Sequence, residues 1–206
     1  MSLHYFLDAL PQSIIADGQE VRINTDFRAI LRYDRLTRED SEDPERVAEA
    51  LSEIFPDDVP AITEELIGAL EAFIGGGEGE KKPGPSKKLL GVNNNRPFDF
   101  IIDDRLIWSA FFVAFRINLR EIGYLHWWDF LELMNELPES VRFEKIIHYR
   151  TIDTKAPGVS KEQKKVYDAL QKHYKIAERV KTPQDLKIEE ALRNGLDPAQ
   201  FLENKG

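Results

Sequence analysis

The 206-residue sequence contains no cysteine, which excludes disulfide frameworks, thiolate zinc sites and cysteine nucleophiles. It also lacks a long apolar run. The longest apolar stretch, residues 107–115, is interrupted by Ser109 and is far shorter than the roughly 20 residues that a helix needs to span a bilayer. Residues 1–5 show neither the basic nor the apolar region of a secretion signal. We therefore expect a protein that acts in a cytoplasm, without a membrane partner.

The motifs of common catalytic and cofactor sites are missing as well. The four histidines lie far apart, without the HExxH spacing of a zinc site on a helix. Gly79 and Gly84 have the spacing of the glycines in a phosphate-binding loop, but Pro85 follows where that loop needs a lysine. A nucleophile elbow and a dinucleotide-binding motif are also missing. We expect neither an enzyme nor a bound cofactor or metal.

Two features have both a chemical and a structural interpretation. His126 beside Trp127 could be a metal ligand, but a hydrogen-bonded histidine at the start of a helix explains it more simply. Asp103 and Asp104 could be a pair of acid–base carboxylates, but adjacent acidic residues at a helix N-terminus are expected from the helix dipole. We expect both features to be structural.

Charge is distributed unevenly along this acidic chain, whose net charge is -9. Residues 1–80 carry 6 Lys/Arg and 19 Asp/Glu, a net of -13, whereas residues 81–206 carry 22 and 18, a net of +4. The acidic balance argues against nucleic-acid binding as the main role. The two halves could attract each other within a chain or between subunits. Alternatively, both are ordinary solvated surfaces.

Hydrophobic periodicity predicts a mainly α protein with one small N-terminal β-hairpin. Asp17-Gly18, within residues 13–23, is a favoured two-residue hairpin turn. A lone hairpin is only marginally stable, so it must pack on another element. Helices are expected over residues 25–37, 44–55 and 60–74 in the first part of the chain, with Thr25 as the N-cap of the first.

A break separates this part from a second helical part. Residues 75–97 are rich in glycine, proline, lysine and asparagine, which predicts a flexible linker. Helices are expected over residues 103–117, 125–134, 140–150 (capped by Ser140), 160–180 and 182–194. The chain thus divides into an acidic module of residues 1–74, the linker, an aromatic-rich module of residues 98–155 and an extended polar helical tail of residues 156–206.

The helix over residues 103–117 is apolar almost all round, which is typical of a core helix or of an assembly interface. On the next helix, Trp127 and Phe130 share a face, and Trp128 points about a quarter-turn away. The tail carries a lysine-rich stretch from residue 161 to residue 187. Because acidic residues are interleaved with these lysines, the stretch reads as a solvated helix surface rather than a phosphate-binding site.

Three segments together resemble the bacteriophage gp-fifteen family, whose genes lie beside the tail tape-measure gene. The first is the hairpin leading into Ile-Asn-Thr-Asp-Phe-Arg at residues 23–28, and the second is Phe-Asp-Phe at residues 98–100 with the helix after it. The third is Leu-His-Trp-Trp-Asp-Phe at residues 125–130, followed by Tyr149-Arg150. The resemblance covers residues 10–152. The family's usual Tyr-Gly-Ile-Asp-Leu is replaced by Phe-Arg-Ile-Asn-Leu at residues 115–119.

The resemblance implies a tail-assembly chaperone that holds the tape-measure protein in the cytoplasm of the bacterial host. A tape measure is a very long helical chain whose apolar surface would aggregate if left bare, and a groove could cover it by binding a helix. On this hypothesis the partner-binding residues are Trp108, Phe112, Trp127 and Trp128.

Five alternatives stay open. The protein could be a structural component retained in the phage tail, it could bind other tail proteins, or it could form a homo-oligomer. An enzyme of a class without recognisable motifs and a DNA-binding regulator are the remaining two rivals, and the second has only the lysine-rich stretch in its favour.

Overall fold

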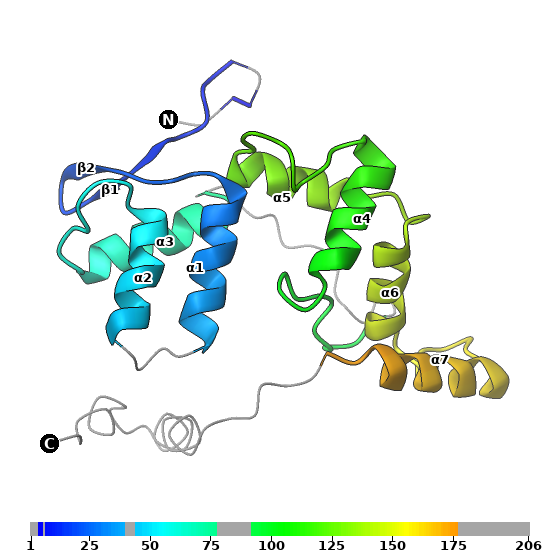
Figure 1. Ribbon diagram of the computed structural model, residues 1–206. Helices are drawn as coiled ribbons and strands as arrows, with labels where there is room; N and C mark the ends of the chain where they lie inside the picture. The colour runs from blue at the N-terminus through cyan, green and yellow to red at the C-terminus, as the bar shows by residue number, and fades with distance from the viewer. Residues whose placement is uncertain (1–3, 6, 40–43, 78–91, 177–206) are drawn as a thin grey trace, which may run out of the picture. The chain divides into compact units, whose positions relative to one another are not determined.

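The computed structural model describes residues 4–5, 7–39, 44–77 and 92–176 (Figure 1). The chain divides into a unit of residues 1–174 and a unit of residues 175–206, and all the elements below belong to the first. They are β1 Ser13–Ala16, β2 Gln19–Arg22, α1 Phe27–Glu39, α2 Pro44–Ile54, α3 Glu64–Ile74, α4 Asp104–Phe115, α5 Trp127–Asn135, α6 Arg142–Thr151 and α7 Lys161–Tyr174. The expected fold class, mainly α with an N-terminal hairpin, is confirmed. Among the described helices, none has the length and apolarity needed to cross a membrane.

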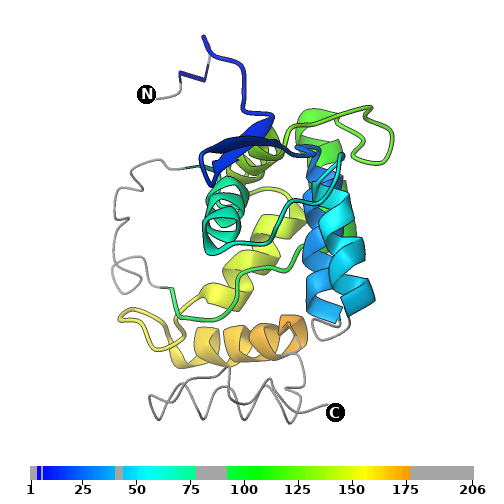
Figure 2. The same ribbon diagram turned by 90° about the vertical axis from the view of Figure 1, so that its left-hand side faces the viewer.

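The hairpin forms as predicted and packs on α3 (Figure 2). Asp17 and Gly18 have φ of 49° and 70°, as the two positions of a type I′ turn require. Ile14 and Ala16 are buried, whereas Ile15 between them is exposed, so one face of the ribbon joins the core. The antiparallel pairs are Ser13 with Arg22, Ile14 with Val21, Ile15 with Glu20 and Ala16 with Gln19.

Two of the predicted helix caps are wrong. Asp26, not Thr25, caps α1, because its Oδ1 accepts from the backbone N–H of Arg28 at 2.9 Å. The buried Thr25 hydroxyl bonds instead to Gln12 and Tyr124, partners that only the fold brings close. Ser140 does not cap α6 either. The N-cap position is Val141, and no side chain closes that end of the helix.

Phe130 of α5 lies at the centre of the hydrophobic core. Its ring stacks on Phe27 of α1 at 4.8 Å between centroids and on Phe111 of α4 at 5.1 Å. Phe100 and Trp127 lie 6.0 and 5.5 Å from the same ring. Such aromatic pairs contribute about 0.5–1.5 kcal/mol each beyond the burial of their area. The acidic and the aromatic-rich parts of the sequence therefore share one core.

Backbone hydrogen bonds join the starts of α1 and α5. The N–H of Trp127 donates to the carbonyl of Thr25 at 2.8 Å, and the N–H of Phe27 donates to the carbonyl of Leu125 at 3.0 Å. The two bonds form an isolated antiparallel bridge. Because each helix begins at this bridge, the direction of α5 is set relative to α1.

His126 is the hydrogen-bonded histidine expected at the start of a helix. Its Nδ1 accepts from the backbone N–H of Trp128 at 3.0 Å, which caps α5. Its Nε2 lies 3.0 Å from the carbonyl oxygen of Pro11. Since Nδ1 accepts, Nε2 carries the proton and donates to that carbonyl. The buried ring thus ties the N-terminal segment to α5.

Two indoles of α5 hold the C-terminal end of α3. The Nε1–H of Trp127 donates to the carbonyl of Ile74 at 2.8 Å, and the Nε1–H of Trp128 donates to the carbonyl of Phe73 at 2.8 Å. The last carbonyls of a helix lack partners within the helix. The indoles add donors at two of them, and the Phe73 carbonyl also accepts from the backbone N–H of Gly76 at 3.0 Å. The Trp128 ring also stacks on Phe73, with 5.5 Å between centroids.

Gly77 allows Trp128 to approach the chain that leaves α3. Its φ is +89°, and its N–H donates to the carbonyl of Ala72 at 2.9 Å. A Cβ at this position would lie 2.8 Å from the indole of Trp128, closer than van der Waals contact allows. A glycine is therefore required at this position both by the backbone conformation and by the packing.

The structure describes only part of the expected linker and only part of the expected tail. Residues 78–91 of the expected linker lie outside the described residues, whereas residues 92–97 run against the end of α6. There the side-chain amides of Asn93 and Asn95 donate to the carbonyls of Ile152 and Arg150 at 3.0 and 2.9 Å. α7 ends at Tyr174, and the helix expected over residues 182–194 lies outside the described residues.

The α3–α5 junction gives the first testable prediction. We expect Gly77→Ala to lower the free energy of unfolding by about 1–3 kcal/mol, because the new methyl group combines left-handed strain with a clash against Trp128. Gly68→Ala is the matched control, since Gly68 lies inside α3 with open space around it, and alanine there should stabilise the protein by about 0.5–1 kcal/mol. Urea unfolding measures both. Shifts of the same sign in the two variants would contradict the packing at Gly77.

Candidate partner-binding surface

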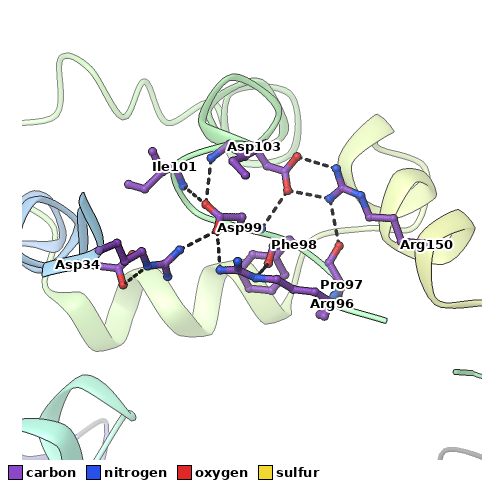
Figure 3. Close-up of polar contacts among 10 residues, drawn as sticks. Asp34, Arg96, Pro97, Phe98, Asp99, Ile101, Asp103 and Arg150 are labelled. Carbon is purple, nitrogen blue, oxygen red and sulfur yellow. Dashed lines mark hydrogen bonds and ion pairs between the residues drawn. The ribbon is translucent and has the colours of Figure 1, made fainter. Parts of the chain in front are cut away.

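A buried ion pair positions the segment that leads into α4. Asp103 and Arg150 are 3% and 6% exposed. The Nη1 and Nη2 groups of Arg150 donate to Oδ2 and Oδ1 of Asp103 at 2.7 and 2.9 Å (Figure 3). Arg150 also donates from Nη1 to the carbonyl of Pro97 at 3.1 Å and from Nε to that of Tyr174 at 2.7 Å. One guanidinium thus joins α6 to α4, to the preceding segment and to the end of α7.

Asp99 extends this network to α1. Its Oδ1 accepts from the backbone N–H groups of Ile101 and Ile102 at 2.8 and 3.0 Å. Its Oδ2 lies 2.6 Å from Nη1 of Arg38, a residue of α1, and 2.5 Å from Nη2 of Arg96 (Figure 3). Because this carboxylate has both backbone and side-chain donors, its position relative to α1 is fixed.

The ionised form of Asp99 is favoured in spite of its burial. Removal from water alone would raise the pKa of this carboxyl. The two backbone N–H donors and the guanidinium groups of Arg96 and Arg38 outweigh that effect, so the pKa of Asp99 lies below its ordinary value. The carboxylate therefore keeps its charge, and its partners, over the physiological pH range.

An apolar groove of about 500 Å³ lies next to this network, between α1, α4 and the loop after α4. Phe100, which stands between Asp99 and Asp103, forms part of its floor, so the network holds that floor in place. The rim carries both signs of charge. The lining residues are Phe27, Leu31, Phe100, Asp104, Arg105, Ile107, Trp108, Leu119, Arg120 and Phe130.

Trp108 is the one predicted site residue that lines this groove. Its indole N–H donates to Oδ1 of Asn118 at 2.9 Å, and its ring stacks on Phe112 with 5.9 Å between centroids. Phe112 is 43% exposed, and its neighbour Val113 is 58% exposed. The apolar surface therefore continues from the groove onto the outer side of α4.

Trp127 and Trp128 do not line the groove. Trp127 is 3% exposed and packs against Phe100 and Phe130, so its ring lies in the core. Trp128 is half-buried over Phe73 and holds the end of α3. In the described structure these two indoles make intramolecular contacts, whereas Trp108 and Phe112 form one surface.

The loop after α4 contains residues 115–119, where the sequence departs from the expected Tyr-Gly-Ile-Asp-Leu. Arg116 has a φ of 60° and closes α4 in the left-handed conformation, which is why glycine suits this position. Asn118 accepts the indole N–H of Trp108 through its side-chain oxygen, a role that needs only an acceptor.

Sequence reasoning missed several parts of this site. Asp103 was assigned to the helix dipole, but its side chain makes no cap hydrogen bond and pairs with Arg150. Arg105, Arg120 and Leu31 received no role. The Phe-Asp-Phe and Tyr-Arg motifs pointed to the residues of the ion-pair network, but neither motif identified their partners. Among the described residues, no group of three or more His, Asp or Glu could hold a metal ion.

Comparison with known proteins gives one match. The family model described as "Bacteriophage Gp15 protein" matches residues 6–176, a range that includes the groove, the ion-pair network and the α3–α5 junction. No curated protein and no solved structure matches the chain.

The coupling between Asp103 and Arg150 can be tested by comparing the stability of a double variant with that of the single variants. Arg150→Met should lower the free energy of unfolding by about 3–5 kcal/mol, because it leaves the Asp103 carboxylate buried without a countercharge. Asp103→Leu combined with Arg150→Met removes both charges, and chemical denaturation should find it less destabilised than Arg150→Met alone. A double variant as unstable as the sum of the two single variants would contradict a coupled pair.

The pKa of Asp99 predicts a specific acid dependence. A carboxyl whose pKa is lower in the folded state adds stability above its unfolded pKa of about 3.9, and this is lost as the pH falls through the folded value. Wild type should exceed Asp99→Asn in free energy of unfolding at pH 7. This difference should shrink as the pH is lowered from about 5 to about 2. A difference that stays constant over that range would show that the Asp99 carboxylate is not specially stabilised.

Proposed function

Because the chain belongs to the bacteriophage Gp15 protein family, we propose that it is a phage tail-assembly protein that binds the tape-measure protein during tail morphogenesis. It acts by binding rather than by catalysis, without a cofactor, in the cytoplasm of the bacterial host. Support comes from the match to the family over residues 6–176, from the tail-assembly role that the resemblance implies, and from the groove beside Trp108.

The single observation that carries the proposal is a preformed apolar groove that opens onto exposed aromatic surface. Helix-in-groove binding needs a trough that accepts apolar side chains one turn apart on a partner helix. The floor offers aromatic rings and aliphatic side chains, and the exposed Phe112 and Val113 extend the apolar surface along α4. Because the ion-pair network holds Phe100 in place, binding does not require the floor to be ordered first.

The charged rim suits a role in solubility as well as in recognition. Asp104, Arg105 and Arg120 line the groove and are exposed, so they stay hydrated when an apolar helix fills the floor. The net charge of -9 keeps the complex soluble, because proteins far from neutrality repel one another. A long helical partner covered in this way would not aggregate through its apolar face.

Co-expression with the neighbouring tape-measure protein tests the proposal. Pull-down followed by size-exclusion chromatography with light scattering should give a soluble complex, with the tape measure insoluble alone. Phe112→Ser with Val113→Ser should weaken the complex by about tenfold or more, because two apolar contacts are lost. Val166→Ser on α7, where the side chain is 56% exposed, is the matched control and should bind as wild type.

Three results would count against the proposal. The tape measure could be soluble without the chain, or the α4 variant could bind as well as Val166→Ser while its circular dichroism and melting temperature show an intact fold. If the chain instead remains in purified phage particles and makes no separate complex, the structural role in the finished tail is correct.

A further inference from the structure

A second apolar groove, of about 350 Å³, lies between α1, α2 and α3. Its apolar lining includes Leu51, Phe55, Ile62, Leu66, Ile67 and Leu70. The floor residues are buried or half-buried, but Ile62 and Ile67 are 51% and 46% exposed. These two exposed aliphatic side chains continue the apolar lining of the groove to its surface.

Two of the three helices at this groove, α2 and α3, are acidic, whereas α1 carries four arginines, of which Arg32 pairs with Glu53 of α2 at 3.1 Å. Residues 44–77, which include α2 and α3, carry eight Asp/Glu and one Lys/Arg. Glu71 lines the groove itself. Tyr33 lines it from α1, and the pKa of its phenol is raised by burial and then by the charges of Glu71 and Asp34. The negative potential of the surface therefore reaches into the groove.

The two grooves differ in charge. The groove beside Trp108 has two arginines and one aspartate among its lining residues, whereas Glu71 is the charged residue among those that line the groove of α1, α2 and α3. A segment suited to the second groove would meet like charges at Arg105 and Arg120 of the first. Electrostatic complementarity therefore favours helices of different charge at the two grooves.

We propose that the groove between α1, α2 and α3 binds a basic amphipathic helix of a partner protein. Aliphatic side chains one turn apart enter between Ile62 and Ile67, and lysines or arginines on both sides of that stripe face the carboxylates of α2 and α3. This surface does not depend on what fills the groove beside Trp108.

The helix α7 of a second copy of the chain is less suited to this groove. α7 is rich in lysine, but Val166 is its one large aliphatic side chain that is exposed. Tyr167 and Tyr174 of the same helix make ring contacts with His148 and Tyr149 of α6, so they are not available as anchors. A helix with several aliphatic residues on its open face fills the groove better.

A model peptide provides the probe. A fluorescein-labelled helix of about 18 residues, five turns long, carries leucines at i, i+3, i+4 and i+7 with lysines elsewhere, and its partner peptide carries glutamates in place of the lysines. Fluorescence anisotropy with the full-length protein should show binding of the lysine peptide. The glutamate peptide should bind at least about tenfold more weakly.

Matched variants locate the site. Ile67→Ser should weaken binding of the lysine peptide by about tenfold or more, whereas Ile15→Ser on β1, where the side chain is 63% exposed, should not. Glu71→Gln should weaken binding and reduce its dependence on salt, and Glu162→Gln on α7 should change neither. Circular dichroism confirms that each variant folds.

Two outcomes would overturn the proposal. Equal binding by Ile67→Ser and Ile15→Ser would show that the peptide is attracted only by the general acidity of the chain. If light scattering shows self-association that Ile67→Ser abolishes and that the peptide competes with, the occupant is a second copy. Phe112→Ser should leave peptide binding unchanged, so a failure at this groove and a failure of the tape-measure proposal can be told apart.

Discussion

The bidentate ion pair between Arg150 and Asp103 is the constraint on which the arrangement of the described helices depends. Two charges buried this deeply need further hydrogen bonds besides their own pairing. Here Arg150 also donates to the carbonyls of Tyr174 and Pro97, and Asp103 also accepts from the backbone N–H of Asp99. The pair therefore fixes more than two side chains. It places α6 against the start of α4, and through Asp99 and Arg38 it fixes that start relative to α1. Phe100 lies inside this network, so the floor of the groove beside Trp108 is held by polar contacts that lie behind it.

The acidic and aromatic-rich parts of the sequence, which a long polar stretch separates, form one core around Phe130. The α3–α5 junction is a specific contact between these parts, because two adjacent tryptophans donate their indole N–H groups to two successive carbonyls of α3.

This arrangement of the helices leaves two grooves open, one beside Trp108 and one between α1, α2 and α3. Both combine an apolar floor with exposed aliphatic or aromatic side chains, and they differ in the charge of their surroundings. The proposals made for the two grooves therefore involve two different helical segments.

The sequence predicts local structure well here, because local structure depends on neighbouring residues. The Asp17-Gly18 turn, the helix periodicities and the hydrogen-bonded His126 all follow from short-range rules. Thr25 does not cap α1 because its hydroxyl bonds to Gln12 and Tyr124, which only the fold brings close. Ser140 does not cap α6 because Val141 occupies the N-cap position. The pairing of Asp103 with Arg150 spans 47 positions, and no sequence periodicity identifies a partner at that distance.

The burial of aromatic residues is also hard to predict. The sequence shows which face of a helix is apolar, but not whether another element covers that face. Trp127 is therefore in the core, while Phe112, one of the same set of predicted residues, is exposed.

Hydrogen exchange of the full-length protein, free and in complex with the co-expressed tape-measure protein, tests the central claim most directly. The claim is that a prefolded core presents grooves to a helical partner. It predicts that exchange in α5 and α6 is slow in both states, and that the partner adds protection in residues 100–120 and at the start of α1, which form the groove beside Trp108. Added protection confined to residues outside both grooves would contradict it. So would a free protein in which α5 exchanges rapidly and becomes protected only in the complex.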